Sequence, residues 1–470
     1  MDKYKRLASN TVLMAVSTFS SKVLTYLLTT YHTHMMRTGD YGTITVVNTI
    51  GNLLIPIVSL GIANAIIRYG LEKGVSKKSV YTNGLISVSI GFAVLLAISP
   101  LLNMVPFIGD NVEGYWPLLL AFVLISCLRT LNCQIVRARQ LMRLYAVDGI
   151  LCTATALGFN VLFLSGFGIK PEGILLATMC SDACSTIFLF FVAGLWRYVD
   201  FHIDKVLFRK MLRYSLPLIS ASLFWWVTNV SDQLFVKAMW GAGWNGIYVA
   251  CYKLPSLLSI VATFFTEAWQ LSAFTDGQKA GRERFFTRVF GAYQGVMFLA
   301  AAGITLLCRP IMSVFVAKEY YIGWMYIPVL CAATAFSSLD NFLNSVYMLE
   351  KKSMHSLLTM AAGAVLNILL NWAFIPKSGP MGASIATFIS YFVVFVVRVI
   401  DTRRLIRIDF GLLRIAVNLA ILAAEALLMI YQLPLWPLWC TLLCALMLLV
   451  NFGALWDTVR HVLGRRGQRA

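Results

Sequence analysis

WPLWCTLLCALMLLVNFGALW, residues 436–456, contains no acidic or basic side chain. At 1.5 Å per residue, an α-helix of about 20 residues spans a hydrocarbon core of roughly 30 Å. The stretch is continuously apolar and does not alternate with polar residues, as a barrel strand would. It therefore predicts a membrane-spanning helix.

Comparable stretches recur along the whole chain of 470 residues, of which 59% are hydrophobic and 13% charged. So much apolar surface exceeds what a water-soluble core can bury, and lipid is the expected solvent. We predict an all-α polytopic membrane protein with about 14 transmembrane helices. The predicted spans are 9–35, 43–67, 80–103, 115–135, 146–166, 173–196, 214–239, 246–272, 286–308, 322–349, 354–375, 380–400, 412–431 and 436–456.

The 39 lysine and arginine residues are concentrated in every second gap between these spans. Because short cytoplasmic loops collect positive charge, both termini are predicted to be cytoplasmic. Orientation and contact with anionic headgroups account for the net charge of +18, so nucleic acid is not an expected partner. The alternate, outer gaps hold only Arg37, Lys170, Arg309, Lys318 and Lys377.

Two internal matches indicate a repeat of six spans. GDYG at 39–42 recurs as GWNG at 243–246, and PEGILLATMCS at 171–181 resembles PMGASIATFIS at 380–390. An even number of spans preserves orientation, so the halves are parallel repeats, which typically enclose a cavity and alternate its access by rocking. We predict an N-terminal six-helix lobe at 1–196, a cytoplasmic amphipathic linker at 197–213, a second six-helix lobe at 214–400, and two additional helices with a basic tail at 401–470.

Three lysines lie at membrane depth or beside it. Lys22 is well inside the first span with no acidic neighbour within one turn, where a charge costs on the order of 2.5–3.5 kcal/mol on insertion scales. It should face a wet cavity, or else pair with an acid on another span. Lys237 and Lys253 bracket the outer turn between spans seven and eight, and Lys237 could also reach outward to the surface.

Further ionisable groups occur singly within spans. Arg129, Asp182 and Asp340 lie in spans four, six and ten, while Glu267 lies on nearly the same face of span eight as Lys253. Interhelical ion pairs would account for these groups. Alternatively, Arg129 contacts a phosphate and one of the acids couples transport to a proton or sodium ion.

Motifs of catalysis are missing from the sequence. There is no GxxxxGK[ST] phosphate loop, HExxH, GxSxG or CxxC, and the predicted outer loops are short. Asp110 and Glu113 in one such loop are thin support for a lipid-linked sugar transferase. We predict a protein that is not an enzyme, without a metal site or cofactor, whose energy comes from a proton or sodium gradient or from a partner.

Short motifs in both halves resemble the polysaccharide repeat-unit flippases of the multidrug and oligosaccharidyl-lipid exporter superfamily. The first half has SSK at 20–22, YG at 41–42, SLG at 59–61 and AIIRY at 65–69. The second half has NVSD at 229–232, GIY at 246–248, YKLP at 252–255 and AWQ at 268–270. The likeness covers about residues 1–400. One departure is RTGD at 37–40, where the family usually has a Gly-Pro turn.

This resemblance implies two six-helix lobes around a V-shaped cavity, in the bacterial inner membrane. It also implies that Lys22, Arg68 and Lys253 hold the pyrophosphate of an undecaprenyl-linked oligosaccharide, with Asp232 as the paired acid. Arg129 and Lys237 join this set because of their charge and depth. The expected function is flipping of that lipid for polysaccharide export, by a monomer working with a polysaccharide polymerase or assembly proteins. The alternative is a cation-coupled multidrug exporter of the same superfamily, which acids at the site would favour.

Overall fold

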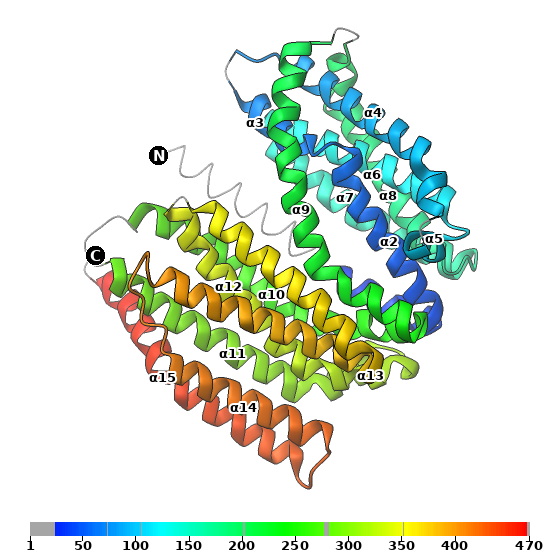
Figure 1. Ribbon diagram of the computed structural model, residues 1–470. Coiled ribbons are helices and arrows are strands. Elements are labelled where there is room, and N and C mark those ends of the chain that lie inside the picture. The colour runs from blue at the N-terminus through cyan, green and yellow to red at the C-terminus, as the bar shows by residue number, and fades with distance from the viewer. Residues whose placement is uncertain are drawn as a thin grey trace. The chain divides into compact units, whose positions relative to one another are not determined.

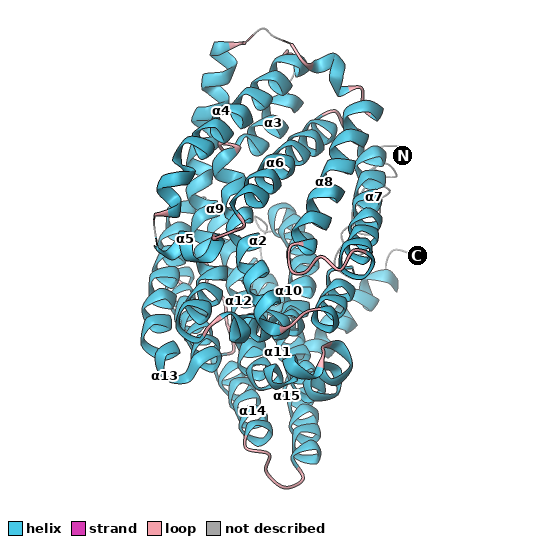
Figure 2. Ribbon diagram, turned by 90° about the vertical axis from the view of Figure 1, so that its right-hand side faces the viewer, coloured by secondary structure: helices cyan, strands magenta, loops and turns pink. Residues whose placement is uncertain are grey.

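The computed structural model describes residues 24–72, 74–104, 106–200, 203–276, 282–350 and 352–467. Within these ranges the side chains of residues 106–108, 217–218, 220–222, 224–229, 267–276, 353 and 457–467 are outside the description. Every regular element in the described ranges is a helix, and Figure 2 draws no strand there.

Eleven helices among the described residues are long and apolar enough to cross a membrane, which confirms the all-α polytopic class. The lower number has identifiable causes. The predicted first span is described only from residue 24, and the predicted spans 354–375 and 380–400 form one bent helix. The predicted span 214–239 lies in a helix with many side chains outside the description.

The chain divides into two compact units, Met1–Trp226 and Val227–Ala470. The first unit contains a helix at residues 24–35 and then, in chain order (Figure 1), α2 (Thr38–Val58), α3 (Ile62–Leu71), α4 (Lys77–Asn103), α5 (Pro106–Val112), α6 (Trp116–Ala138), α7 (Met142–Val161), η1 (Leu162–Gly166), α8 (Gly173–Val192) and η2 (Leu195–Tyr198).

Helix α9 (Lys205–Trp240) begins in the first unit, inside the stretch predicted as a linker, and ends in the second. The second unit continues with α10 (Ala242–Asp276), α11 (Arg282–Phe315), η3 (Lys318–Tyr326), α12 (Ile327–Leu349), α13 (Ser353–Thr402), α14 (Leu412–Ile430) and α15 (Trp436–Gly467).

The second predicted span, 43–67, is broken into α2 and α3. Pro56 lacks a backbone N–H, and the chain then turns through Leu60 and Gly61 with φ of 52° and 62°. The Gly61 N–H donates to the Pro56 carbonyl at 2.9 Å, so the turn satisfies the end of α2. The sequence SLG at 59–61 therefore ends one helix instead of continuing it.

Helix α13 bends sharply at Gly379, which has φ 55° and ψ −137°. Only glycine adopts this conformation without strain, and a Cβ here would lie 2.9 Å from the ring of Trp240. The Trp240 indole donates to the Ile375 carbonyl at 2.8 Å, beside the bend. The bend lies between the two predicted spans, so α13 corresponds to both.

Aromatic rings fill the interior of the second unit. Phe336 of α12 lies within 5.2–5.9 Å, centroid to centroid, of four phenylalanine rings, mostly edge to face. The four rings are those of Phe298, Phe388, Phe392 and Phe395. This packing joins α11, α12 and the second half of α13 within the unit.

Small residues allow close approach of helices in the first unit, as is common in membranes. At Gly91 of α4, an added Cβ would lie 1.9 Å from the Val58 carbonyl oxygen of α2. Gly51 of α2 similarly faces the ring of Phe122, at 2.6 Å from an added Cβ. These glycines fix how closely α2 packs on its neighbours.

We expect Gly91→Ala to destabilise the protein by about 1–3 kcal/mol, because a backbone carbonyl cannot move aside as a side chain can. Gly303→Ala on α11 is the matched control, since nothing lies within 4 Å of its added Cβ. The control should be neutral or stabilising by about 0.5–1 kcal/mol. Thermal unfolding in detergent measures both, and equal melting temperatures would contradict the close packing of α4 on α2.

Candidate functional site

A polar cavity of about 500 Å³ lies within the first unit, among α6, α7 and α8. Its wall includes Arg129 of α6, Asp148 and Cys152 of α7, and Ser181 and Asp182 of α8. These helices are otherwise strongly apolar and long enough to cross a membrane. Charged groups at membrane depth are costly unless they face a cavity or one another, and here they do both.

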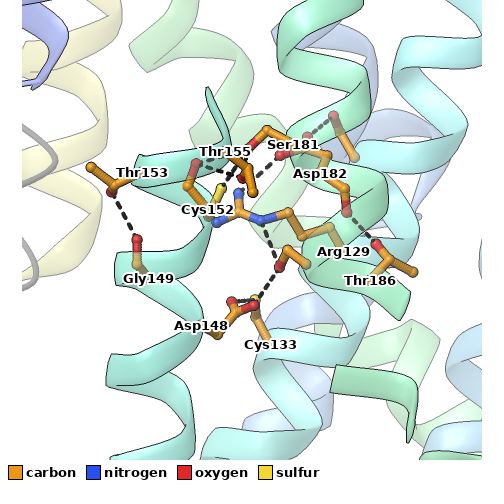
Figure 3. Close-up of polar contacts among 12 residues, drawn as sticks. Arg129, Cys133, Asp148, Gly149, Cys152, Thr153, Thr155, Ser181, Asp182 and Thr186 are labelled. Carbon is orange, nitrogen blue, oxygen red and sulfur yellow. Dashed lines mark hydrogen bonds and ion pairs between the residues drawn. The ribbon is translucent and has the colours of Figure 1, made fainter. Parts of the chain in front are cut away.

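The predicted residues Arg129 and Asp182 come together as an ion pair between α6 and α8. Arg129 Nη1 lies 3.4 Å from Asp182 Oδ1, and Ser126 donates its hydroxyl to Asp182 Oδ2 at 2.5 Å. The side chain of Asp182 is 8% exposed, whereas that of Arg129 is 32% exposed. The guanidinium therefore retains access to the cavity while it holds the carboxylate (Figure 3).

A second carboxylate, Asp148, joins the same network through a serine. Arg129 Nε donates to Ser185 Oγ at 3.2 Å, and the Ser185 hydroxyl donates to Asp148 Oδ1 at 2.6 Å. The Cys133 thiol lies 3.5 Å from Asp148 Oδ2. Figure 3 shows Asp148 and Asp182 on opposite sides of the guanidinium. With both acids ionised, one cation faces two anions.

Sequence reasoning missed Asp148. It lies two residues from the predicted start of its span, at 146, where a carboxylate can usually reach water. In the structure it is only 1% exposed and belongs to the cavity wall. A usable signal existed in Cys152, one helical turn later on the same face of α7, which together with Asp148 forms a polar stripe.

In the second unit, Asp232 of α9 lies in a buried cage of neutral polar groups and is 3% exposed. Its Oδ1 accepts from Asn371 Nδ2 at 2.7 Å and Asn367 Nδ2 at 3.3 Å. Its Oδ2 accepts from the hydroxyls of Tyr248, at 2.9 Å, and Thr387. Within the described residues, Asp232 makes no ion pair with a lysine or arginine.

One oxygen of this cage is left over. Asn371 Oδ1 is buried and has no hydrogen-bond partner among the described residues, whereas Asn367 Oδ1 accepts from Ser231 at 2.6 Å and from Asn371 at 3.1 Å. A carboxylate, amide oxygens and hydroxyls are the ligands that hard cations prefer. In the structure, however, the amide nitrogens and hydroxyls donate to Asp232 and hold it as an acceptor, so a cation would need the oxygen atoms of these groups to turn toward it.

The third predicted acid, Asp340 of α12, is 5% exposed, and neither of its carboxylate oxygens has a hydrogen-bond partner among the described residues. Arg398 of α13 is also buried, at 3% exposed, and donates to the Asp340 backbone carbonyl at 3.0 Å and to the Thr359 hydroxyl at 3.1 Å. The two charges thus lie near each other without a direct side-chain bond.

The remaining predicted residues are distributed over both units. Arg68 is in the last turn of α3, and its guanidinium lies 4.4 Å from the centroid of the Tyr214 ring. Lys237 and Lys253 are partly buried on α9 and α10. Lys22 and the side chain of Glu267 lie outside the described residues.

No group of three or more histidine, cysteine, aspartate or glutamate side chains converges as a metal site in the described ranges. The ten cysteines are all free thiols, and five of them are buried. The arrangement offers ion pairing, proton exchange and cation binding inside apolar helices. Charged clusters of this kind inside a many-helix membrane fold are typical of transporters.

Comparisons with known proteins identify a family and a shared fold. Residues 7–269 match the family described as polysaccharide biosynthesis protein, and the chain belongs to this family. The lipid II flippase MurJ in an inward closed conformation is similar over 95% of this chain and 99% of its own, with a TM-score of 0.74 and 13% identity.

Two further solved structures share the fold. An inward-facing MATE family multidrug resistance transporter of the MOP superfamily gives a TM-score of 0.65 at 16% identity, covering 82% of this chain and 94% of its own. A MOP superfamily transporter from Pyrococcus furiosus, described by a reverse polarity of its binding pocket, gives 0.52 at 14% identity, covering 84% and 92%. Among curated protein sequences, none matches significantly.

Proposed function

We propose that this protein flips an undecaprenyl-pyrophosphate-linked oligosaccharide across the bacterial inner membrane by alternating access, for polysaccharide export. The observation that carries the proposal is the family match together with a fold shared with a lipid II flippase. The proposal includes cytoplasmic termini, a monomer, and a polysaccharide polymerase or other assembly protein as the partner that receives the flipped lipid.

The substrate explains why cations are needed at membrane depth. A pyrophosphate and several sugars cannot enter hydrocarbon without losing their hydration, which is costly for bare anions. Basic side chains in a wet cavity replace that hydration while the polyprenyl tail stays in lipid. Lys22, Arg68 and Lys253 are the proposed contacts of the pyrophosphate, with Arg129 and Lys237 as additional contacts.

Arg129 can contact a phosphate in addition to its present partners or in exchange for one of them. Its Nη1 and Nε are used by Asp182 and Ser185, and a guanidinium has five N–H donors in all, so further donors are available to an anion. An arriving phosphate would compete with Asp182 for the guanidinium, and a released carboxylate at this depth would favour taking up a proton. Substrate binding and proton binding are thereby linked at one arginine.

Asp232 is the proposed site of the coupling ion in the second unit. A sodium ion there would be bound by the carboxylate and the Thr387 hydroxyl oxygen, with Asn371 turning its Oδ1 toward the ion in place of the Nδ2 that now donates to Asp232. Asn371 Oδ1 supports this assignment, because it has no partner in the part of the chain that the structure describes and a buried amide oxygen is rarely left without one. A bound sodium ion or proton would neutralise the charge of Asp232. The protein would then favour the conformation in which the oxygen atoms around Asp232 point toward the bound ion.

A cation-coupled multidrug exporter is the second candidate. It is favoured by one observation, the two carboxylates and single guanidinium around the cavity of the first unit. Such a site attracts an organic cation more than a free anion. The two candidates differ in what crosses the membrane, so one reconstituted system can separate them.

The test uses purified full-length protein in proteoliposomes. A polyprenyl-pyrophosphate oligosaccharide should become accessible to an external, membrane-impermeant oxidant, whereas a fluorescent drug cation should not move. We expect Lys253→Ala to slow flipping at least about tenfold, the value of one lost charge-assisted contact. Lys318→Ala removes an exposed lysine and is the matched control. Drug movement without lipid movement would overturn the flippase and favour the exporter.

A further inference from the structure

A second cavity, of about 990 Å³, lies in the second unit between the start of α11, the segment before α14, and α14 itself. Helices α14 and α15 form a hairpin that packs against α11 (Figure 1). This cavity belongs to neither the Arg129 network nor the Asp232 cage. Its position at the base of the two additional helices raises the question of what it binds.

Four arginines and two acids line it, which leaves two positive charges in excess. Three of the arginines are exposed and make no ion pair within the described ranges. They are Arg284, Arg288 and Arg407. Unpaired guanidiniums gathered in one concave site are the usual recognition groups for phosphate.

The other charged groups shape the site. Arg414 Nη2 donates to the Gly291 carbonyl at 3.1 Å. When the Gln294 amide is turned so that its oxygen faces the guanidinium, Arg414 Nε donates to that oxygen at 2.6 Å. Asp409 Oδ1 accepts from the Gly411 N–H at 2.9 Å, so this carboxylate is engaged by the backbone at the start of α14. Glu283, the other acid that lines the cavity, is in the first turn of α11 and is exposed.

Two facts indicate a lipid as the source of the phosphate. Leu412 and Leu413, on the first turn of α14, line the cavity and are 46% and 81% exposed, so apolar surface adjoins the arginines. Residues 282–288 and 403–414 both belong to segments that the charge pattern assigns to the cytoplasmic side. Basic pockets between helices on that side of a membrane suit anionic headgroups.

We propose that this cavity binds the phosphate of an anionic phospholipid at the cytoplasmic face, with the guanidiniums on the headgroup and the exposed leucines against an acyl chain. The lipid fastens the α14–α15 hairpin to α11 and is separate from the transported substrate. The proposal requires only a phosphate ligand at these arginines, and it holds whether or not the transported molecule is a lipid-linked oligosaccharide.

The test measures phosphatidylglycerol retained by delipidated full-length protein, using native mass spectrometry. The variant carries Arg284→Gln, Arg288→Gln and Arg407→Gln, and we expect its affinity to fall about tenfold or more. The matched control carries Arg143→Gln, Arg209→Gln and Arg404→Gln, which removes the same charge from exposed sites outside the cavity. The control should bind as the wild type does. Thermal unfolding verifies that all three proteins are folded.

Phosphatidylcholine and inorganic phosphate complete the test. Phosphatidylcholine should bind weakly and without regard to either set of substitutions. If inorganic phosphate at millimolar concentration binds with the same dependence on the three arginines and phosphatidylglycerol does not, the lipid source is overturned. An equal loss of phosphatidylglycerol in the cavity variant and the control would overturn the site itself.

Discussion

Asp232→Asn is expected to leave the protein folded and to abolish the dependence of transport on the ion gradient, because it removes a coupling that for two linked ligands typically changes affinity by roughly 5- to 150-fold. The fold should tolerate the change because the groups at Oδ2 are the hydroxyls of Tyr248 and Thr387, which can accept a hydrogen bond as well as donate one. An amide nitrogen can therefore replace Oδ2, while the charge that would bind a proton or sodium ion is lost.

Asp232→Ala should behave differently, because it leaves four donors without their acceptor. We expect it to cost on the order of 2–4 kcal/mol of stability in detergent. Ser390→Ala on α13 is the control, since among the described residues this buried hydroxyl donates to the Ala386 carbonyl of its own helix and to no other group. Initial rates in proteoliposomes under separate sodium and proton gradients measure the coupling. If Asp232→Asn transports at the wild-type rate and with the same dependence on the ion gradient, Asp232 is not the coupling site.

Most of the fold could be predicted from the sequence because lipid imposes one strong rule. A spanning helix needs about 20 apolar residues, and residues 436–456 meet that rule without any tertiary information. Breaks inside spans were harder to predict. Gly61 and Gly379 both take positive φ. Because glycine is common in membrane helices, the amino-acid sequence alone does not show which glycine turns the chain.

The site was predictable to a smaller extent. A lone ionisable residue in a span indicates a partner, and Arg129 and Asp182 do form an ion pair between two apolar helices. Their pairing depends on how α6 packs against α8, which the spacing along the chain does not contain. The same holds for Asp232, whose partners Asn367, Asn371 and Thr387 are neutral and more than 130 positions away. Neutral polar residues are frequent in spans and give little signal.

Arg129→Ala is expected to cost about 1–3 kcal/mol of stability, because it leaves Asp182, 8% exposed, without its cation. The cost should be below the 3–5 kcal/mol typical of a fully buried pair, since the Arg129 side chain is 32% exposed to the cavity. Adding Asp182→Ala removes the stranded carboxylate, and the double variant should recover most of the lost stability. Melting temperatures of the four proteins in the cycle give this coupling directly.

The transport rates of the same four proteins separate the two roles of the pair. If Arg129 and Asp182 only hold α6 against α8, the double variant regains transport together with stability. If the guanidinium binds the phosphate in exchange for Asp182, the double variant regains stability alone and its flipping stays at least about tenfold below the wild type. Asp182→Asn sharpens the distinction, because Ser126 can still bond the amide while the proton acceptor is gone. That variant should keep its stability and bind substrate without a dependence on pH, and a pH dependence equal to that of the wild type would contradict the exchange.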